Sequence, residues 1–180
     1  MNRIALATAL TVIAAFAATN SANTANPAPP APAFDLEAAT ADTCKGKERN
    51  RERYLAALDT IVNKRELARV EEFYAAEYRN NSGPPGAPQG PAAIRHYLTL
   101  LSKAFPDRKV ENVMLLCAGD FVIVRSVVTG THLGDYFGKP ATGRTTRVMG
   151  TDIYRMRDGM LMERWGNEDA LGLERQISGK

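Results

Sequence analysis

Apolar residues recur at helical spacing along the first half of the folded part of this 180-residue chain. The spacing predicts one helix over Glu48–Val62 and a second over Glu66–Tyr78, each with a single apolar face. The segment Asn80–Pro91 is rich in glycine and proline and is therefore expected to be a loop. Pro91 suits the first turn of a third helix, which Pro106-Asp107 ends.

The pattern then changes to alternation, which indicates strands. Strands are predicted at Lys109–Cys117, Phe121–His132, Thr145–Arg157 and Met160–Asn167. Asp158-Gly159 suits the tight turn of a final hairpin, and Asp169 can cap a short last helix over Ala170–Ile177. Helices followed by a run of strands favour the α+β class, with the helices packed on one face of a curved antiparallel sheet.

The N-terminus has a different pattern. One basic residue, Arg3, precedes the uncharged apolar run Ile4–Ala17, which is too short to span a membrane comfortably and ends in the small-x-small site Ala15-Phe16-Ala17. These features predict a signal peptide over residues 1–17, with an uncleaved membrane anchor as the alternative. Residues 18–43, rich in Ala, Asn and Pro, are expected to form a disordered tether before a domain over 44–180. The mature protein is therefore expected to be secreted or periplasmic, with no stable membrane span.

Composition and charge exclude several classes of function. Hydrophobic residues make up 44% of the chain, and the net charge is +3 without a block of Lys or Arg, which argues against nucleic-acid binding. Two histidines and two distant cysteines give no zinc-like spacing, and no phosphate or dinucleotide loop is visible, so neither metal nor cofactor is expected. In an oxidising compartment Cys44 and Cys117 could form a disulfide; the alternative is a buried Cys117 and a free Cys44.

Two residues could carry proton chemistry. Alternate residues of a strand share a face, so Asp152 lies with Val148, Gly150 and Tyr154 on an apolar face. Loss of hydration there would raise the pKa of Asp152 and make it a general acid or base. The alternative is a structural Asp152, paired with a cation such as Arg125 or bonded to a loop. His132, at the end of its strand, is the second candidate catalytic residue.

The chain resembles the SnoaL-like polyketide cyclases, within the nuclear transport factor 2-like superfamily, over nearly all of residues 50–178. The resemblance rests on short motifs that are weak singly and specific together: Phe73-Tyr74, Ala104-Phe105-Pro106-Asp107, Thr129-Gly130-Thr131-His132, Pro140-Ala141-Thr142-Gly143-Arg144, Gly150-x-Asp152-Ile153-Tyr154-Arg155, Glu163-x-Trp165 and Asp169-x-Leu171-Gly172-Leu173.

The resemblance implies a cone-shaped α+β barrel around a deep apolar pocket, usually in a homodimer or higher oligomer. It also implies cofactor-free ring closure of a polyketide ester by aldol condensation, with Asp152 as the acid/base. The candidates for lining the pocket are Asn81, Tyr154, Trp165, Arg125 and His132. Asn81 stands where many members carry a histidine, and asparagine does not transfer protons at neutral pH.

These observations predict an exported, cofactor-independent enzyme of the cyclase, isomerase or lyase type, acting on an apolar carbonyl compound. Two alternatives are a periplasmic protein that binds an apolar ligand in the same pocket without turnover, and a structural protein that oligomerises through its open sheet face. An enclosed pocket around Asp152 would favour either of the first two over the third.

Overall fold

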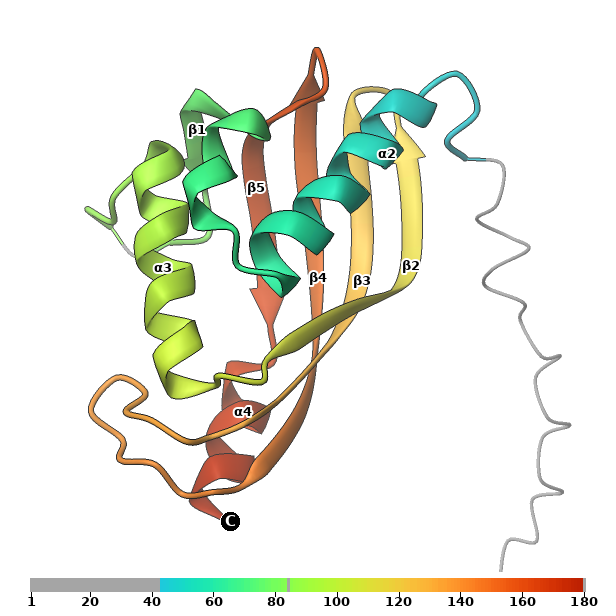
Figure 1. Ribbon diagram of the computed structural model, residues 1–180. Helices are drawn as coiled ribbons and strands as arrows, with labels where there is room; N and C mark the ends of the chain where they lie inside the picture. Colours follow the sequence, from blue (N-terminus) through green and yellow to red (C-terminus); the bar gives the residue numbers. More distant parts are fainter. Residues whose placement is uncertain (1–42, 84, 180) are drawn as a thin grey trace, which may run out of the picture. The chain divides into compact units, whose positions relative to one another are not determined.

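One curved sheet of five strands, in the order β1-β5-β4-β3-β2, forms the framework of the computed structural model, which describes residues 43–83 and 85–179 (Figure 1). The predicted signal peptide and most of the predicted tether lie outside the described residues. The strands are β1 (Tyr74–Asn80), β2 (Lys109–Ala118), β3 (Phe121–Thr131), β4 (Thr145–Arg157) and β5 (Met160–Glu168). The sheet is not closed into a barrel, since β1 and β2 stand at its two edges.

Helices cover one face of this sheet. Figure 1 shows α2 and α3 crossing the same face, with α4 at the end of the sheet. The helical elements are α2 (Glu48–Ala57), its π-helical continuation η1 (Leu58–Asn63), the 3₁₀ turn η2 (Leu67–Glu72), α3 (Gly90–Ala104) and α4 (Ala170–Ser178). The described helices are all too short or too polar to cross a membrane. The predicted α+β class is confirmed.

The predicted helix over residues 66–78 is wrong in its second half. Only Leu67–Glu72 is helical, and Tyr74–Asn80 forms β1, which runs parallel to β5. Tyr74 and Tyr78 are both buried. A spacing of four residues puts two side chains on one face of a strand as well as of a helix, so the pattern did not separate the two. The sheet is therefore mixed, and not wholly antiparallel as expected.

The final hairpin carries an irregularity that decides which residues face inwards. Asp158 and Gly159 both have positive φ, which gives the expected tight turn. Arg157 pairs with Met160 and Met156 with Leu161, but Arg155 pairs with Glu163, so one extra residue is inserted in β5. Such a bulge moves every later residue of the strand to the other face.

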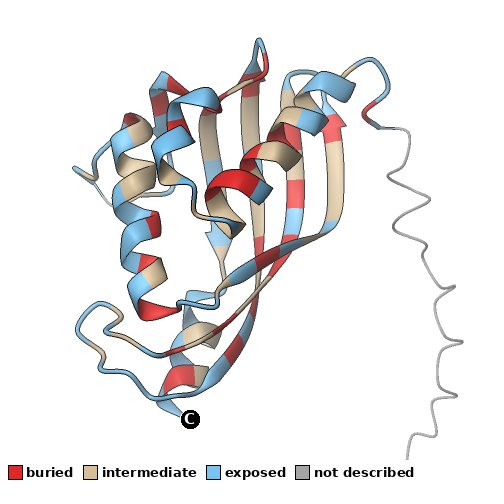
Figure 2. Cartoon of the chain, viewed as in Figure 1, coloured by how far each residue is buried: buried red, intermediate tan, exposed pale blue. Residues whose placement is uncertain are grey.

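Alternate residues of the central strands form the core (Figure 2). Val122 and Val124 of β3 and Met156 of β4 are almost fully buried, and they belong to one cluster with Ile61 of η1 and Phe73. Residues between them face outwards. The core therefore lies between the inner face of the sheet and the helices, and it fixes the positions of α2 and η1 over β3 and β4.

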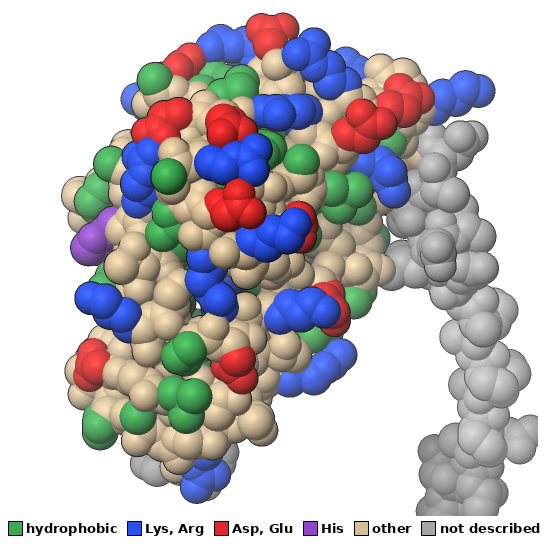
Figure 3. Space-filling model, viewed as in Figure 1, with side chains coloured by type: hydrophobic (Ala, Val, Ile, Leu, Met, Phe, Trp, Pro, Cys, Tyr) green, Lys and Arg blue, Asp and Glu red, His purple; other side chains and the backbone are tan. Residues whose placement is uncertain are grey.

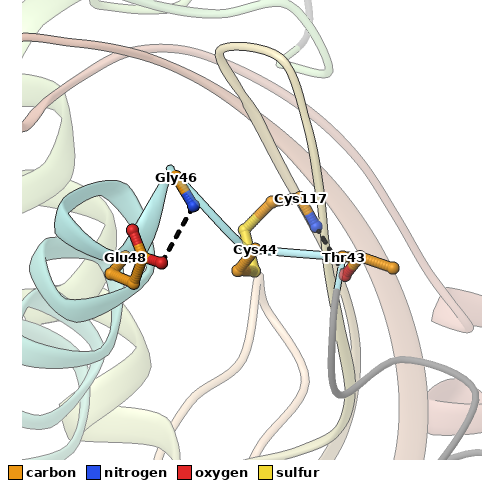
Figure 4. Close-up of a disulfide and its surroundings, with 5 residues drawn as sticks. All are labelled: Thr43, Cys44, Gly46, Glu48 and Cys117. Atoms are coloured by element: carbon orange, nitrogen blue, oxygen red, sulfur yellow. Dashed lines mark hydrogen bonds between the residues drawn. A yellow bond between two sulfur atoms is a disulfide. The ribbon is translucent and has the colours of Figure 1, made fainter.

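A disulfide joins the start of the described chain to the edge of the sheet (Figure 4). Cys44 is bonded to Cys117 of β2, across a sequence separation of 73 residues. The Cys117 backbone N–H also donates to Thr43 Oγ1 at 3.2 Å. Because α2 begins four residues after Cys44, these links anchor the segment that leads into α2.

Candidate active site

A cavity of about 80 Å³ lies between the inner face of the sheet and the helices. Helical spacing brings Tyr54, Leu58 and Val62 to its wall from α2 and η1, and α3 contributes Ile94 and Leu98. The volume suffices for several water molecules.

Asp152 of β4 lines this cavity and is paired with Arg164 of β5. Arg164 Nη2 lies 2.7 Å from Asp152 Oδ1, and the two side chains are only 18% and 13% exposed. Glu168 lies on the same side, with its carboxylate 3.7 Å from the same nitrogen. Asn80 Oδ1 accepts a long hydrogen bond of 3.4 Å from Arg164 Nη1. The cavity thus holds a cation between two carboxylates.

Burial is the main influence on the acidity of Asp152. It raises the pKa of Asp152 above the ordinary value of 3.8, because the charged form loses hydration. Arg164 lowers that pKa and Glu168 raises it further, and the net direction is upwards. A carboxylate with a raised pKa can take up a proton and return it, which is what an acid/base residue must do.

Tyrosines surround the ion pair. Tyr54, Tyr74, Tyr78 and Tyr154 all line the cavity. Burial raises the pKa of Tyr74 to about 12, and it also raises the pKa of the other three phenols. At neutral pH these hydroxyls are therefore protonated and can donate hydrogen bonds to a ligand oxygen.

One of these phenols is poised for a ligand. Tyr78 is 1% exposed, and its hydroxyl has no hydrogen-bond partner among the described residues. Tyr54 differs, since its hydroxyl donates to Asn112 Oδ1 at 3.2 Å, and Ser126 Oγ donates to the same oxygen at 2.9 Å. A buried donor without a partner carries a free-energy cost that a ligand oxygen would relieve.

The structure brings only some of the predicted site residues together. Asp152 and Tyr154 both line the cavity. Trp165 lies on the opposite face, 38% exposed, because the bulge in β5 sets Gly166 rather than Trp165 opposite Asp152. Arg125 is also on the outer face, where its guanidinium contacts Met149 Sδ at 3.4 Å. These two predictions of pocket residues are therefore wrong.

Asn81 also lies outside the cavity. It is exposed, and its side-chain amide donates to Glu163 Oε2 at 3.1 Å. The preceding residue, Asn80, points inwards and lines the cavity. The pocket residue was thus misplaced by one position, which in a strand changes the face.

His132 is fully buried, but it is not among the residues that line the cavity. Its ring stacks on Phe105 with centroids 5.2 Å apart, and its Nδ1 lies 3.1 Å from Thr142 Oγ1. Its backbone oxygen accepts from Gly143 N–H at 2.9 Å. His132 therefore fastens the loop after β3, and the structure does not bring it to Asp152 as a second catalytic residue.

Sequence reasoning missed Arg164, Glu168 and Asn80. Arg164 and Glu168 alternate with Gly166 on β5, so they share a face with Asp152 once the bulge is known. Asn80 is paired with Arg164 across the parallel β1–β5 contact. No group of three or more metal-binding side chains occurs among the residues that the structure describes.

A family model described as SnoaL-like polyketide cyclase matches residues 52–177, about two thirds of the chain. The chain belongs to this family. Among similar proteins, aklanonic acid methyl ester cyclase DnrD of Streptomyces peucetius is 33% identical over 113 residues, which are 60% of this chain and 77% of that one. DauD of Streptomyces sp. strain C5, with the same description, is 33% identical over 69% of its length.

Solved structures agree with the fold of this SnoaL-like chain. TsrD from Streptomyces laurentii is 26% identical with a TM-score of 0.63, over 74% of this chain and 95% of that one. A SnoaL-like polyketide cyclase from Agrobacterium tumefaciens is 22% identical with a TM-score of 0.62, over 71% and 97% of the two chains. The resemblance inferred from the motifs is thereby confirmed.

Gly166 is expected to be essential for the ion pair. A Cβ at this position would overlap Asp152 Oδ1 and the Arg164 guanidinium. We expect Gly166→Ala to displace the ends of both side chains and, because the ion pair that they form is largely buried, to lower the free energy of unfolding by about 1–3 kcal/mol. Chemical denaturation measures this, with Asn167→Ala on the outer face of the same strand as control. Equal stability of Gly166→Ala and wild type would contradict the packing described here.

Proposed function

We propose that this SnoaL-like protein is a cofactor-independent acid/base enzyme of the cyclase, isomerase or lyase type, which acts on an apolar carbonyl compound. The observation that carries the proposal is a largely buried carboxylate, Asp152, with a raised pKa in a partly open cavity lined by apolar side chains and phenols. The similarity to proteins described as aklanonic acid methyl ester cyclases supports an intramolecular aldol ring closure.

The reaction would use Asp152 twice. Its carboxylate takes a proton from the carbon next to a carbonyl, and the electron pair of the broken C–H bond moves onto the carbonyl oxygen. The resulting enolate carbon attacks a second carbonyl of the same molecule, and the new alkoxide takes the proton back from Asp152. Phenols such as Tyr78 and Tyr154 would donate hydrogen bonds to the oxygens as charge develops there.

The direct test is incubation of the purified protein with aklanonic acid methyl ester and with a panel of apolar ketones and keto esters, followed by mass spectrometry of the products. The proposal predicts either a cyclised or isomerised product or exchange of protons next to the carbonyl. Ligands that bind but neither react nor exchange would favour a second function.

That second function is ligand binding without turnover, and one observation favours it. Asp152 is already paired with Arg164, which lowers the pKa of the carboxyl and so weakens it as a base. In a binding protein, the pair and the phenols would hold a polar group of an apolar ligand. Proton exchange in a bound ketone separates the two functions, because only the enzyme catalyses it.

The pH dependence of turnover follows from the raised pKa of Asp152. Below that pKa the carboxyl is protonated and cannot accept a proton, so kcat/KM should fall as the pH falls. We expect this acid limb at a pH above 3.8, the ordinary value for aspartate. Measurement of kcat/KM at a series of acidic pH values locates this fall. Full activity well below pH 3.8 would contradict the assignment of Asp152 as the base.

We propose further that the protein acts outside the cytoplasm, in the periplasm or secreted. The apolar run Ile4–Ala17 and the Cys44–Cys117 disulfide support this, because disulfides persist in oxidising compartments. N-terminal sequencing of the mature protein tests it. A chain that starts at Met1 in a cytoplasmic fraction would contradict export.

A homo-oligomer is proposed from the outer face of the sheet. Leu116, Ile123, Ile153 and Trp165 stand side by side across β2, β3, β4 and β5. Ile153 and Trp165 are exposed on this face, whereas the opposite side of the molecule, seen from the helices in Figure 3, carries interspersed acidic and basic side chains. An apolar row of this kind suits contact with a second copy, and light scattering of wild type and Ile153→Lys tests it.

A further inference from the structure

The guanidinium of Arg164 occupies an unusual position for a purely structural cation. One nitrogen, Nη2, faces both carboxylates, 2.7 Å from Asp152 and 3.7 Å from Glu168. The other, Nη1, contacts Asn80 Oδ1 at 3.4 Å. The side chain is 18% exposed and lines the cavity, so it is accessible to a ligand from the cavity and largely hidden from bulk water.

The contact of Arg164 with Asp152 is short, but its hydrogen-bond geometry is poor. Although Nη2 lies 2.7 Å from Asp152 Oδ1, that oxygen accepts no well-aligned hydrogen bond from any described residue. The attraction between the two charges lowers the pKa of Asp152 more than their hydrogen bonding does, so the contact depends mainly on the charge of the carboxylate. Tyr78 offers a second donor on the same cavity, because its buried hydroxyl has no partner among the described residues.

Protonation of Asp152 changes the balance of charge around Arg164. The nearest negative charge is then Glu168, which is 1.0 Å farther from Nη2 than Asp152 is (3.7 Å against 2.7 Å). In a site shielded from water a cation favours the nearest anion strongly. Once Asp152 is neutral, it no longer competes for the charge of Arg164, and Nη2 can therefore bind another oxyanion.

We propose that Arg164 forms an oxyanion site. The Asp152 carboxylate occupies this site at rest, and the enolate oxygen of the substrate occupies it after proton transfer. This role of Arg164 rests on the proposed function. The ligand class is a planar conjugated oxyanion, an enolate or a phenolate. Tyr78 is assigned as its second donor.

The proton transfer balances with these groups alone. A C–H bond of the substrate breaks, an O–H bond forms on Asp152, and the negative charge moves from the carboxylate to the enolate oxygen. Arg164 stays beside the charge throughout, so the total charge of the cavity does not change. This is the arrangement in which a fixed cation stabilises a transition state without reorganising.

The test uses Asp152→Asn as a neutral copy of the protonated aspartate, and 4-nitrophenol as probe, because the absorbance of its phenolate differs from that of the neutral phenol. Asp152→Asn should bind 4-nitrophenolate at least about tenfold more tightly than wild type, since the competing carboxylate charge is gone. The double variant Asp152→Asn/Arg164→Met should lose at least tenfold of that affinity. Binding requires no turnover, so this test stands apart from that of the proposed function.

Control variants distinguish binding at Arg164 from the general effect of removing a positive charge. In the Asp152→Asn background, Arg155→Met removes a cation from the outer face of the same hairpin, where it pairs with Glu163, and should change the affinity less than twofold. Arg108→Met removes the other arginine that lines the cavity. If Arg164→Met does not fold, Arg164→Gln takes its place. Affinity that is unchanged without Arg164, or that depends on Arg108 instead, overturns the proposal.

Discussion

Replacement of Asp152 by asparagine is expected to lower kcat by about 10²–10⁴-fold, the usual contribution of a positioned acid or base. Asparagine has nearly the same shape but cannot accept the proton, and its neutral side chain also releases Arg164 from the ion pair. The measurement is steady-state turnover of whichever ketone or ester of the panel reacts, with circular dichroism to confirm the fold.

The control for this substitution is Glu163→Gln, which neutralises a carboxylate on the neighbouring strand but on the outer face, where Glu163 pairs with Arg155. It should leave kcat within about twofold. If Asp152→Asn retains wild-type kcat while the protein is folded, Asp152 is not the base, and the ion pair with Arg164 is structural.

Loss of the Cys44–Cys117 disulfide is expected to lower the free energy of unfolding by about 2–4 kcal/mol, because the bond closes a long loop in the unfolded chain. The double variant Cys44→Ser/Cys117→Ser should melt at a lower temperature than wild type, and reductant should lower the wild-type melting temperature towards that of the variant. Thermal denaturation with and without reductant measures both effects.

The double variant is its own control, since reductant should leave its melting temperature unchanged. If reductant leaves the wild type unchanged too, and two free thiols titrate, the disulfide is absent from the protein in solution. Because the disulfide anchors the segment before α2, and α2 carries Tyr54 to the cavity, a loss of ligand affinity should accompany its reduction.

Local patterns predicted most of the fold because most of its elements have a clear period. The strand Thr145–Arg157 and the turn at Asp158-Gly159 occur where alternation and turn residues predicted them. The exception, β1, has two buried tyrosines four residues apart, a spacing common to both periods. Its parallel pairing with β5 is a contact distant in sequence that no local pattern contains.

The candidate site was harder to predict, because the residues that line it are determined by the register in which the strands pair. The alternation of side chains along β4 was sufficient to place Asp152 and Tyr154 on the cavity side. Across the hairpin, the extra residue in β5 turns Trp165 outwards and Arg164 inwards. No residue type marks this bulge, so the partner of Asp152 was not foreseeable from the sequence.

Family resemblance pointed to Asp152 as the candidate acid but did not predict the residues around it. Asn81 was taken as the pocket residue where the neighbouring Asn80 lines the cavity, and His132 was taken as catalytic where it holds a loop. Asn81 was selected because it stands where many family members carry a histidine, and His132 because it is a titratable residue at the end of its strand. Their side chains are directed by strand pairing and by packing against Phe105, which motifs do not encode.

The central claim, that Asp152 moves a proton in the cavity between the sheet and the helices, is tested most directly by hydrogen exchange. Aklanonic acid methyl ester and the panel of apolar ketones are incubated in D₂O with wild type or Asp152→Asn, and deuterium next to the carbonyl is measured by mass spectrometry. We predict that wild type incorporates deuterium into at least one of these compounds and that Asp152→Asn does not. Equal incorporation with both proteins, or none with wild type for a compound that binds, would contradict the claim.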